Sequence, residues 1–330
     1  MTSIELNGPV NILVVEGLTM MDASPFIDDI RAAAPPGSTV EVVSGLRDAF
    51  AHAGDVEVML GILNEDFFAA APNLRWIHAT ASGVDMFMFE RFVESDVVLT
   101  GEKGLVGGHL ADTGWGLLLA LTRQIHTAVR LGPDAWNHRV EMRRNEIELA
   151  GLTMGLVGFG GTGREMARRA VAFGMKTIAV DWFPAAPDHG VVEVWGPDRL
   201  DDLLAQADVV SVNLPLTDQT HAMFDSDLFA KMKPGSYLVN VTRGEIVDGD
   251  ALVAALRSGH LAGAALDVAP GEPLPPEHPL FHLPNVAMTP HTAGASQLRA
   301  PRNVARFVRN LVNAQSGLPF EGVVDKRAGF

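Results

Sequence analysis

The strongest constraint on the fold of this chain is the alternation of short apolar runs with amphipathic, helix-like segments. Strands that alternate with helices form right-handed βαβ units, in which helices cover both faces of a parallel sheet. The first third of the chain holds five runs that we predict as buried strands, with segments such as SPFIDDIRAAA between most of them: NILVVE (11–16), TVEVVS (39–44), VEVMLG (56–61), RWIHAT (75–80) and VVLTG (97–101).

A second series of apolar runs predicts a second α/β domain. The length of 330 residues also suits two domains better than one. We therefore expect an α/β protein with two Rossmann-like or flavodoxin-like, doubly wound parallel-sheet domains and a cleft between them. The runs of the second series are TMGLVGF (153–159), KTIAVD (176–181), DVVSVNL (208–214), SYLVNV (236–241), AGAALDV (262–268) and NVAMTP (285–290).

Two further segments lie outside these series. After a glycine cluster at 101–108, a helical stretch of about 109–130 and a polar segment to about 148 form an insertion that a single sheet does not need. The insertion is either a dimerisation arm or an ordinary packed helix with its loop. Near the end, a helix over about 297–313 carries arginines on one face, which we interpret as a solvated basic stripe: Arg299, Arg302, Arg306 and Arg309.

Charge and composition exclude several classes of function. The formal net charge of −15 repels nucleic acid and anionic membranes, so neither is an expected partner. The chain has no cysteine, which excludes thiolate catalysis, cysteine-bound zinc and disulfides. Its first residues do not resemble a signal peptide, and no apolar run approaches the 18 residues typical of a membrane span. We expect a cytoplasmic protein with no metal site.

The glycine-rich stretch GFGGTG predicts a dinucleotide-binding loop. It follows an apolar run and opens an amphipathic helix, the context that G-x-G-x-x-G requires. Gly158 would make the tight turn, Gly160 would let a pyrophosphate approach the backbone, and Gly163 would let helix and strand pack closely. Asp181 ends the next run, 18 residues after Gly163. A carboxylate there accepts from the ribose hydroxyls of NAD and repels the 2′-phosphate of NADP, so we expect NAD or NADH.

Polar residues follow several of the predicted strands and outline one binding edge, because ligands of open α/β sheets bind at the carboxyl ends of the strands. Arg243 offers a planar fork for a carboxylate or carbonyl, although a surface ion pair is the alternative. Glu272 lies in a proline-rich loop and could hold the imidazole of His291 as a proton donor, or be a solvated acid. Asp248 is predicted to cap a helix.

Ser82, Gly83 and Val84 lie between a predicted strand and a predicted helix in the first domain. Their backbone N–H groups could bind a substrate carboxylate, or the segment could be a plain turn. The neighbouring Met86, Phe87, Met88 and Trp115 either line a pocket or belong to the core, and we favour the core.

Over nearly its whole length the chain resembles the D-isomer-specific 2-hydroxyacid dehydrogenases, a family that includes glyoxylate/hydroxypyruvate reductases. The resemblance is densest in ELAGLTMGLVGFGGTG, NLPLTDQT, MKPGSYLVNVTRGEIVDGDAL, ALDVAPGEP and TPHTAG, which occur in the family's order. It implies NAD(H)-dependent reduction of a 2-oxo acid to the D-2-hydroxy acid. Arg243 would bind the substrate and polarise its carbonyl, His291 would be the general acid, and Glu272 would pair with His291.

The resemblance also implies the domain plan and the remaining contacts. A discontinuous substrate domain, 1–103 plus 297–330, would accompany a cofactor domain, 104–296, with a dimerisation arm at 109–150 in a homodimer. Ser82, Gly83 and Val84 would bind the substrate carboxylate. The cofactor contacts would be Gly158, Gly160, Gly161, Thr162, Gly163, Asp181, Asn213, Leu214, Pro215, Thr220, Val241, Thr242, Asp267, His291 and Gly294, with Asp267 at the nicotinamide amide.

Some features leave alternatives open. Gly161 and Thr162 stand where the family commonly has a long residue before an apolar one, and Asp112 stands where a glutamate is usual. Glu272 argues against the formate dehydrogenase branch, which lacks the glutamate. The resemblance does not name the oxo acid. It also admits a dehydrogenase with another hydride donor such as phosphite, or an NAD-sensing corepressor that binds partner peptides.

Overall fold

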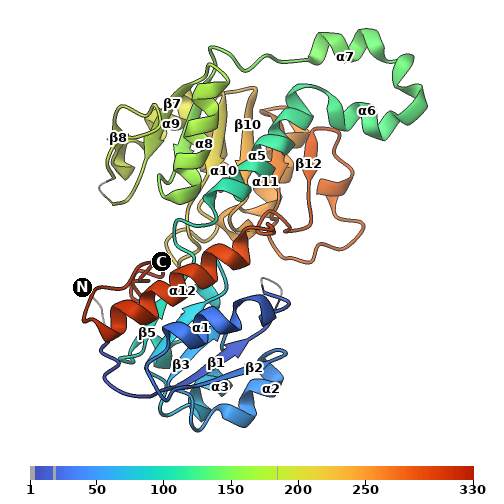
Figure 1. Cartoon of the computed structure of the whole chain (residues 1–330). Helices are drawn as coiled ribbons and strands as arrows, with labels where there is room; N and C mark the ends of the chain where they lie inside the picture. Colours follow the sequence, from blue (N-terminus) through green and yellow to red (C-terminus); the bar gives the residue numbers. More distant parts are fainter. Residues whose placement is uncertain (1–3, 18–19, 184) are drawn as a thin grey trace. The chain divides into compact units, whose positions relative to one another are not determined.

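The computed structural model describes residues 4–17, 20–183 and 185–330. Two compact units divide the chain: unit 1 is Met1–Val106 with Ala295–Phe330, and unit 2 is Gly107–Gly294. Each unit is built on its own parallel sheet (Figure 1). The prediction of two doubly wound α/β folds is therefore confirmed.

Unit 1 has a five-stranded sheet in the order β2-β1-β3-β4-β5, and each strand runs parallel to its neighbours. On one face, Ile30 and Phe307 belong to a single buried cluster; on the other, Phe67 and Phe92 belong to a second. The strands are β1 Asn11–Val15, β2 Thr39–Val43, β3 Val58–Gly61, β4 Trp76–Ala79 and β5 Val98–Thr100, and the α-helices are α1 Ile27–Ala33, α2 Leu46–Ala49, α3 Glu65–Ala70, α4 Glu90–Val93 and α12 Arg299–Gln315.

Unit 2 has a seven-stranded sheet in the order β12-β11-β10-β9-β6-β7-β8, again parallel throughout. The strands are β6 Thr153–Val157, β7 Lys176–Val180, β8 Val194–Trp195, β9 Val209–Val212, β10 Ser236–Asn240, β11 Leu261–Leu266 and β12 Val286–Met288. The α-helices are α5 Gly107–Thr122, α6 Ile125–Leu131, α7 Arg139–Asn145, α8 Gly161–Ala172, α9 Leu200–Gln206, α10 Ser226–Lys231 and α11 Gly249–Arg257.

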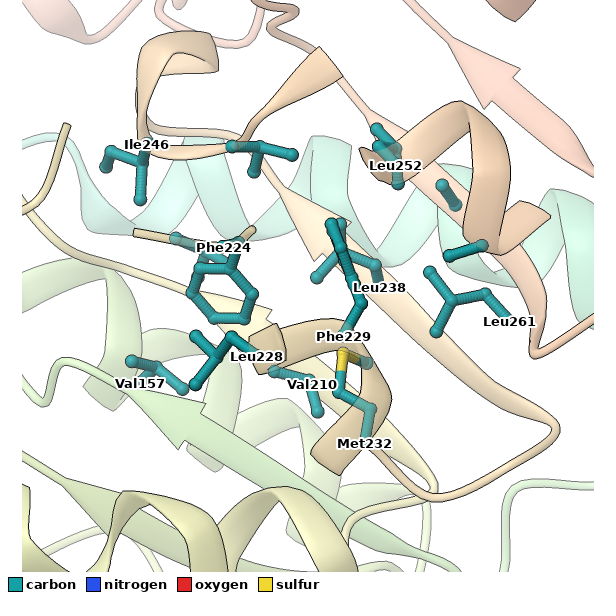
Figure 2. Close-up of a cluster of buried hydrophobic side chains, with 14 of the residues drawn as sticks. Val157, Val210, Phe224, Leu228, Phe229, Met232, Leu238, Ile246, Leu252 and Leu261 are labelled. Atoms are coloured by element: carbon teal, nitrogen blue, oxygen red, sulfur yellow. The ribbon is translucent and has the colours of Figure 1, made fainter. Parts of the chain in front are cut away.

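In unit 2, successive side chains along a strand point to opposite faces of the sheet. Leu238 belongs to a buried cluster with Phe224, with Phe229 of α10 and with Leu252 of α11 (Figure 2). The next residue, Val239, points to the other face, where its side chain lies 3.2 Å from the position that a Cβ on Gly114 of α5 would take. Because both faces are covered, the central strands read in the sequence as continuous apolar runs.

All eleven predicted strands are present, with ends shifted by up to two residues. The two-residue strand β8 was missed, since so short a segment leaves no periodic signal. The continuous helix expected over about 109–130 is wrong. Gln124 has a left-handed backbone, φ 56°, which ends α5 and starts α6. Asp248 caps α11 as predicted, because its side chain accepts from the backbone N–H of Ala251.

The prediction of a solvated arginine stripe on α12 is wrong for two of its four members. Arg299 forms an ion pair with Glu102 at 2.6 Å, and the carboxylate side chain is only 1% exposed. Arg306 donates to the backbone oxygens of Gly101 and Lys103. These arginines face the loop after β5 rather than solvent, which helical spacing alone does not reveal.

Among the residues that the structure describes, no helix is long and apolar enough to cross a membrane.

A buried histidine in unit 1 makes stability depend on pH. His78 on β4 is fully buried, and burial, with a smaller effect of the Arg306 charge, lowers the pKa of its imidazole from 6.5 to about 3. Thr100 Oγ1 accepts from Trp76 Nε1 at 2.8 Å and lies 2.6 Å from His78 Nδ1.

We expect wild-type protein to lose stability relative to His78→Gln as the pH falls from about 6.5 towards 3. The unfolded chain takes up the histidine proton at about pH 6.5 and the folded chain does not, so acid favours unfolding. A shift to a folded pKa of about 3 corresponds to about 2 kcal/mol of differential loss between pH 7 and pH 5. Denaturant unfolding of both proteins at the two pH values measures it. An equal loss in both would contradict the burial argument.

Candidate active site

The predicted catalytic residues follow three neighbouring strands of unit 2. The parallel register aligns Asn240 at the end of β10 with Leu266 on β11, and Leu266 with Met288 on β12. Arg243 comes three residues after β10, and His291 comes three residues after β12. The carboxyl ends of the three strands therefore bring these segments to one edge of the sheet, as expected for a ligand site of an open α/β fold.

His291 and Glu272 form the central contact of this edge. Nδ1 of His291 lies 2.7 Å from Oε2 of Glu272, while Oε1 of the same carboxylate accepts from the backbone N–H of Ala269 at 2.7 Å. The carboxylate is thereby oriented by the backbone, and Nδ1 of the imidazole is its donor. Nε2 is then the ring atom available for proton exchange. The side chain of His291 is 47% exposed, so a small molecule can reach it.

The backbone of His291 is held in a left-handed conformation, φ 54°, by Asp267. The backbone oxygen of Asp267 accepts from the N–H of His291 at 2.8 Å. Its buried carboxylate accepts from Thr289 Oγ1 and from the N–H groups of Thr292 and Ala293. Asp267 thus organises the turn that carries His291, and its expected contact with the nicotinamide amide stays a prediction.

Arg243 is joined to the histidine side of the site by close backbone packing. A Cβ on the next residue, Gly244, would collide with the backbone of Ala269. Ala269 is the residue whose N–H orients Glu272. The loop after β10 and the loop after β11 therefore meet directly, and only glycine at 244 permits that approach.

The glycine loop of unit 2 fits a dinucleotide. Gly158 has φ 94°, and a Cβ there would lie 2.7 Å from the backbone oxygen of Asn213. A Cβ on Gly163 would collide with the backbone oxygen of Gly158. At Gly160, by contrast, no described atom lies within 4 Å of the Cβ position. The turn and the packing thus need two glycines, and the third leaves open space beside the amino end of α8 for phosphate groups.

A further glycine, which the sequence analysis did not single out, supports this loop. Gly107 begins α5, and a Cβ there would collide with the backbone oxygen of Gly161. Asp112 on the same helix accepts from Arg169 of α8 at 2.6 Å. The aspartate in place of the family's usual glutamate therefore packs α5 against α8. Such contacts between distant segments have no local sequence signal.

Asp181 lies beside the glycine loop, where the sequence placed it. Its two oxygens accept from the N–H groups of Phe159, at 2.7 Å, and Phe183, at 2.9 Å. The carboxylate is held between the loop after β6 and the loop after β7. A fixed negative charge at this position suits a ribose with free hydroxyls.

Several other expected cofactor residues shape the loops around the same edge. Thr220 Oγ1 donates to the backbone oxygen of Pro215 at 2.7 Å, and the side chain of Asn213 donates to Ser211. Leu214 and Val241 are buried, Thr242 follows β10, and Gly294 ends unit 2. Gly161 and Thr162 form the first turn of α8.

The expected carboxylate-binding residues Ser82, Gly83 and Val84 lie in unit 1, after β4, whereas Arg243, Glu272 and His291 lie in unit 2. The backbone oxygen of Val84 accepts from the N–H of Phe87, which begins a short 3-10 turn. Phe87 is fully buried and Trp115 is 3% exposed, which confirms core positions for these two, and Met88 packs against the core while partly buried. The core interpretation is wrong for Met86, which is 50% exposed.

Comparison with known proteins gives consistent matches. A family model described as "D-isomer specific 2-hydroxyacid dehydrogenase, NAD binding domain" matches residues 115–293. A glyoxylate reductase of Thermofilum pendens is 34% identical over 300 residues, 88% of this chain and 86% of that protein. A glyoxylate/hydroxypyruvate reductase B of Pectobacterium carotovorum is 34% identical over 307 residues, 90% of this chain and 95% of that protein. A solved D-isomer specific 2-hydroxyacid dehydrogenase of Xanthobacter autotrophicus, in complex with NADPH and MES, has a TM-score of 0.79 at 28% identity, covering 98% of this chain and 100% of that one.

Proposed function

Because the chain belongs to the D-isomer specific 2-hydroxyacid dehydrogenase family, we propose that it reduces a small 2-oxo acid to the D-2-hydroxy acid with NADH, and catalyses the reverse reaction. The relatives named above are glyoxylate and glyoxylate/hydroxypyruvate reductases, oxidoreductases that act on CH–OH groups, and the matching family model is that of an NAD-binding domain. The observation that carries the proposal is the 2.7 Å contact between His291 Nδ1 and Glu272, beside Arg243 at the same sheet edge.

Each residue has a distinct role in this reaction. Unit 2 would hold the cofactor, which supplies the hydride, along its glycine loop. Arg243 would clamp the substrate carboxylate and carbonyl and stabilise the negative charge that develops on the carbonyl oxygen. His291 would deliver a proton to that oxygen from Nε2, and Glu272 would keep the ring oriented. Ser82, Gly83 and Val84 of unit 1 would bind the carboxylate through backbone N–H groups.

We further propose a preference for NADH over NADPH. The Asp181 carboxylate is fixed beside the glycine loop by two backbone N–H groups. A 2′-phosphate there would face this negative charge, whereas a free 2′-hydroxyl can donate to it. Several similar solved structures carry NADPH or NADP, so a direct comparison of the two cofactors is informative.

The test is the loss of nicotinamide absorbance with purified protein and a panel of glyoxylate, hydroxypyruvate, pyruvate, phenylpyruvate and branched-chain oxo acids. NADH and NADPH are run in parallel, and phosphite with NAD is added as a separate reaction. Turnover of an oxo acid with NADH, at least about tenfold faster than with NADPH, supports both proposals. NADH binding without turnover of any oxo acid would overturn the reaction, and turnover of phosphite would replace it.

We also propose that residues 109–150 act as a dimerisation arm of a homodimer. Figure 1 shows α6 and α7 beyond the end of the sheet of unit 2, with the chain returning to β6 through an extended segment. Large apolar side chains along this segment are exposed: Val129 at 75%, Trp136 at 81% and Val140 at 63%. Exposed apolar groups gathered on one projecting segment indicate a protein contact.

Size-exclusion chromatography with light scattering should give a mass about twice the chain mass of 35.3 kDa. The double substitution Val129→Glu with Trp136→Glu should lower it towards the mass of one chain, because buried charges oppose association. A single-chain mass for the wild type would rule out the arm.

A further inference from the structure

Asn240, the last residue of β10, is a buried polar side chain with no role in binding or chemistry assigned so far. It is 1% exposed, although asparagine is rarely buried without a structural reason. Its Nδ2 donates to the backbone oxygen of Arg243 at 2.8 Å. Its Oδ1 accepts from both the N–H and the Oγ1 of Thr242, each at 3.1 Å. The side chain therefore spans the turn that carries the arginine.

The orientation of this amide is determined by its partners. A backbone N–H can only donate and a backbone oxygen can only accept, so Oδ1 must face Thr242 and Nδ2 must face Arg243. A carboxylate or an alkyl group of similar size would lose the bond to Arg243. The side chain of Arg243 also donates to the backbone oxygen of Thr242 at 2.9 Å, so this bond holds the guanidinium against the same turn.

Asn240 also reaches the histidine side of the site through its own backbone. Its backbone oxygen accepts from the N–H of Asp267 at 2.9 Å. Asp267 in turn holds the turn of His291 through its carboxylate and its backbone oxygen. The side chain of Asn240 thus anchors the turn that carries Arg243. The main chain of Asn240 anchors Asp267, which holds the turn that carries His291.

We propose that Asn240 is the positioning residue for Arg243, and that it sets how well the arginine holds the 2-oxo acid and the charge on its carbonyl oxygen. The proposal rests on the proposed function. A clamp held on a rigid turn loses little freedom when substrate binds, and small displacements of such a clamp cost large factors in rate. Asn240 lies outside the glycine loop but also holds Thr242, an expected cofactor contact, so its effect should fall more on substrate use than on NADH affinity.

The experiment compares Asn240→Asp with Asn310→Asp, a matched control in unit 1. Asn310 is also fully buried, and its side chain bonds the backbone of Glu321 through both Nδ2 and Oδ1. Both variants lose one buried amide donor, so both should unfold at a lower temperature. Only Asn240→Asp should lower kcat/KM for the oxo acid, by about 10- to 100-fold, with the Kd for NADH within about twofold of wild type.

The pH dependence separates positioning from general damage. The introduced carboxyl can donate to the Arg243 oxygen only when it is protonated, so the ratio of kcat/KM, Asn240→Asp over wild type, should rise as the pH falls. A kcat/KM within about twofold of wild type, a loss equal at every pH, or a loss matched by NADH affinity would overturn the proposal. A wild-type protein that reduces no oxo acid would instead overturn the proposed function, and the positioning role with it.

Discussion

His291→Gln should lower kcat for reduction of the oxo acid by about 10²- to 10⁴-fold, the usual contribution of a positioned general acid. Glutamine retains a polar side chain of similar length but cannot deliver a proton. The Kd for NADH should change little, because the glycine loop is intact in the variant. Steady-state kinetics with fluorescence titration of NADH measures both quantities. His282→Gln, at an exposed position in the same unit, serves as the control.

The sign of the pH dependence follows from the same role. Reduction by the wild type needs the protonated imidazole, so its rate should fall as the pH rises. Oxidation needs the neutral imidazole, so its rate should fall as the pH decreases. The residual rate of His291→Gln should lack both limbs. Near-normal turnover in the variant, or an unchanged pH profile, would remove His291 from the chemistry.

Arg243→Lys should lower kcat/KM for the oxo acid by about 10²- to 10³-fold, even though it keeps the positive charge. The guanidinium presents a planar fork to a carboxylate and a carbonyl together, whereas an ammonium is a point charge that cannot hold both in one plane. Both KM and kcat should worsen, because the arginine would bind the ground state and also stabilise charge formed during the reaction.

Arg257→Lys, at an exposed position at the end of α11, is the matched control and should leave the kinetics unchanged. If Arg243→Lys were nearly as active as wild type, charge alone would suffice and the fork geometry would not matter. If its loss were matched by a loss of NADH affinity, Arg243 would serve the cofactor rather than the substrate.

Much of the architecture was predictable because it depends on local patterns. A buried parallel strand is apolar along its length, and the eleven predicted runs all became strands. The glycine loop was predictable for a similar reason, since Gly158 and Gly163 are required by a turn and a close approach that any such loop must make. The pairing of Glu272 with His291 was also expected and is present.

The misses in the helical segments concern features that helical spacing does not record. The stripe of arginines on α12 has the spacing of a solvated face, but Arg299 pairs with Glu102, almost 200 positions earlier in the chain. The break at Gln124 depends on a backbone conformation that no strong helix breaker marks in the sequence. Helical spacing tells which residues share a face, and says nothing about what that face meets.

The sequence by itself determined the two α/β units, the strands whose ends carry the site, and the residue types with the right chemistry. Periodicity and strand ends are local properties, so they can be read along the chain. Only the tertiary structure decided the partners: Asp267 holds the turn of His291, Asn240 holds the turn of Arg243, and Gly244 packs on Ala269. These contacts join loops at the ends of strands that become neighbours only in the folded sheet. Which residues meet is therefore set by the order and pairing of the strands, and spacing along the sequence does not reveal it.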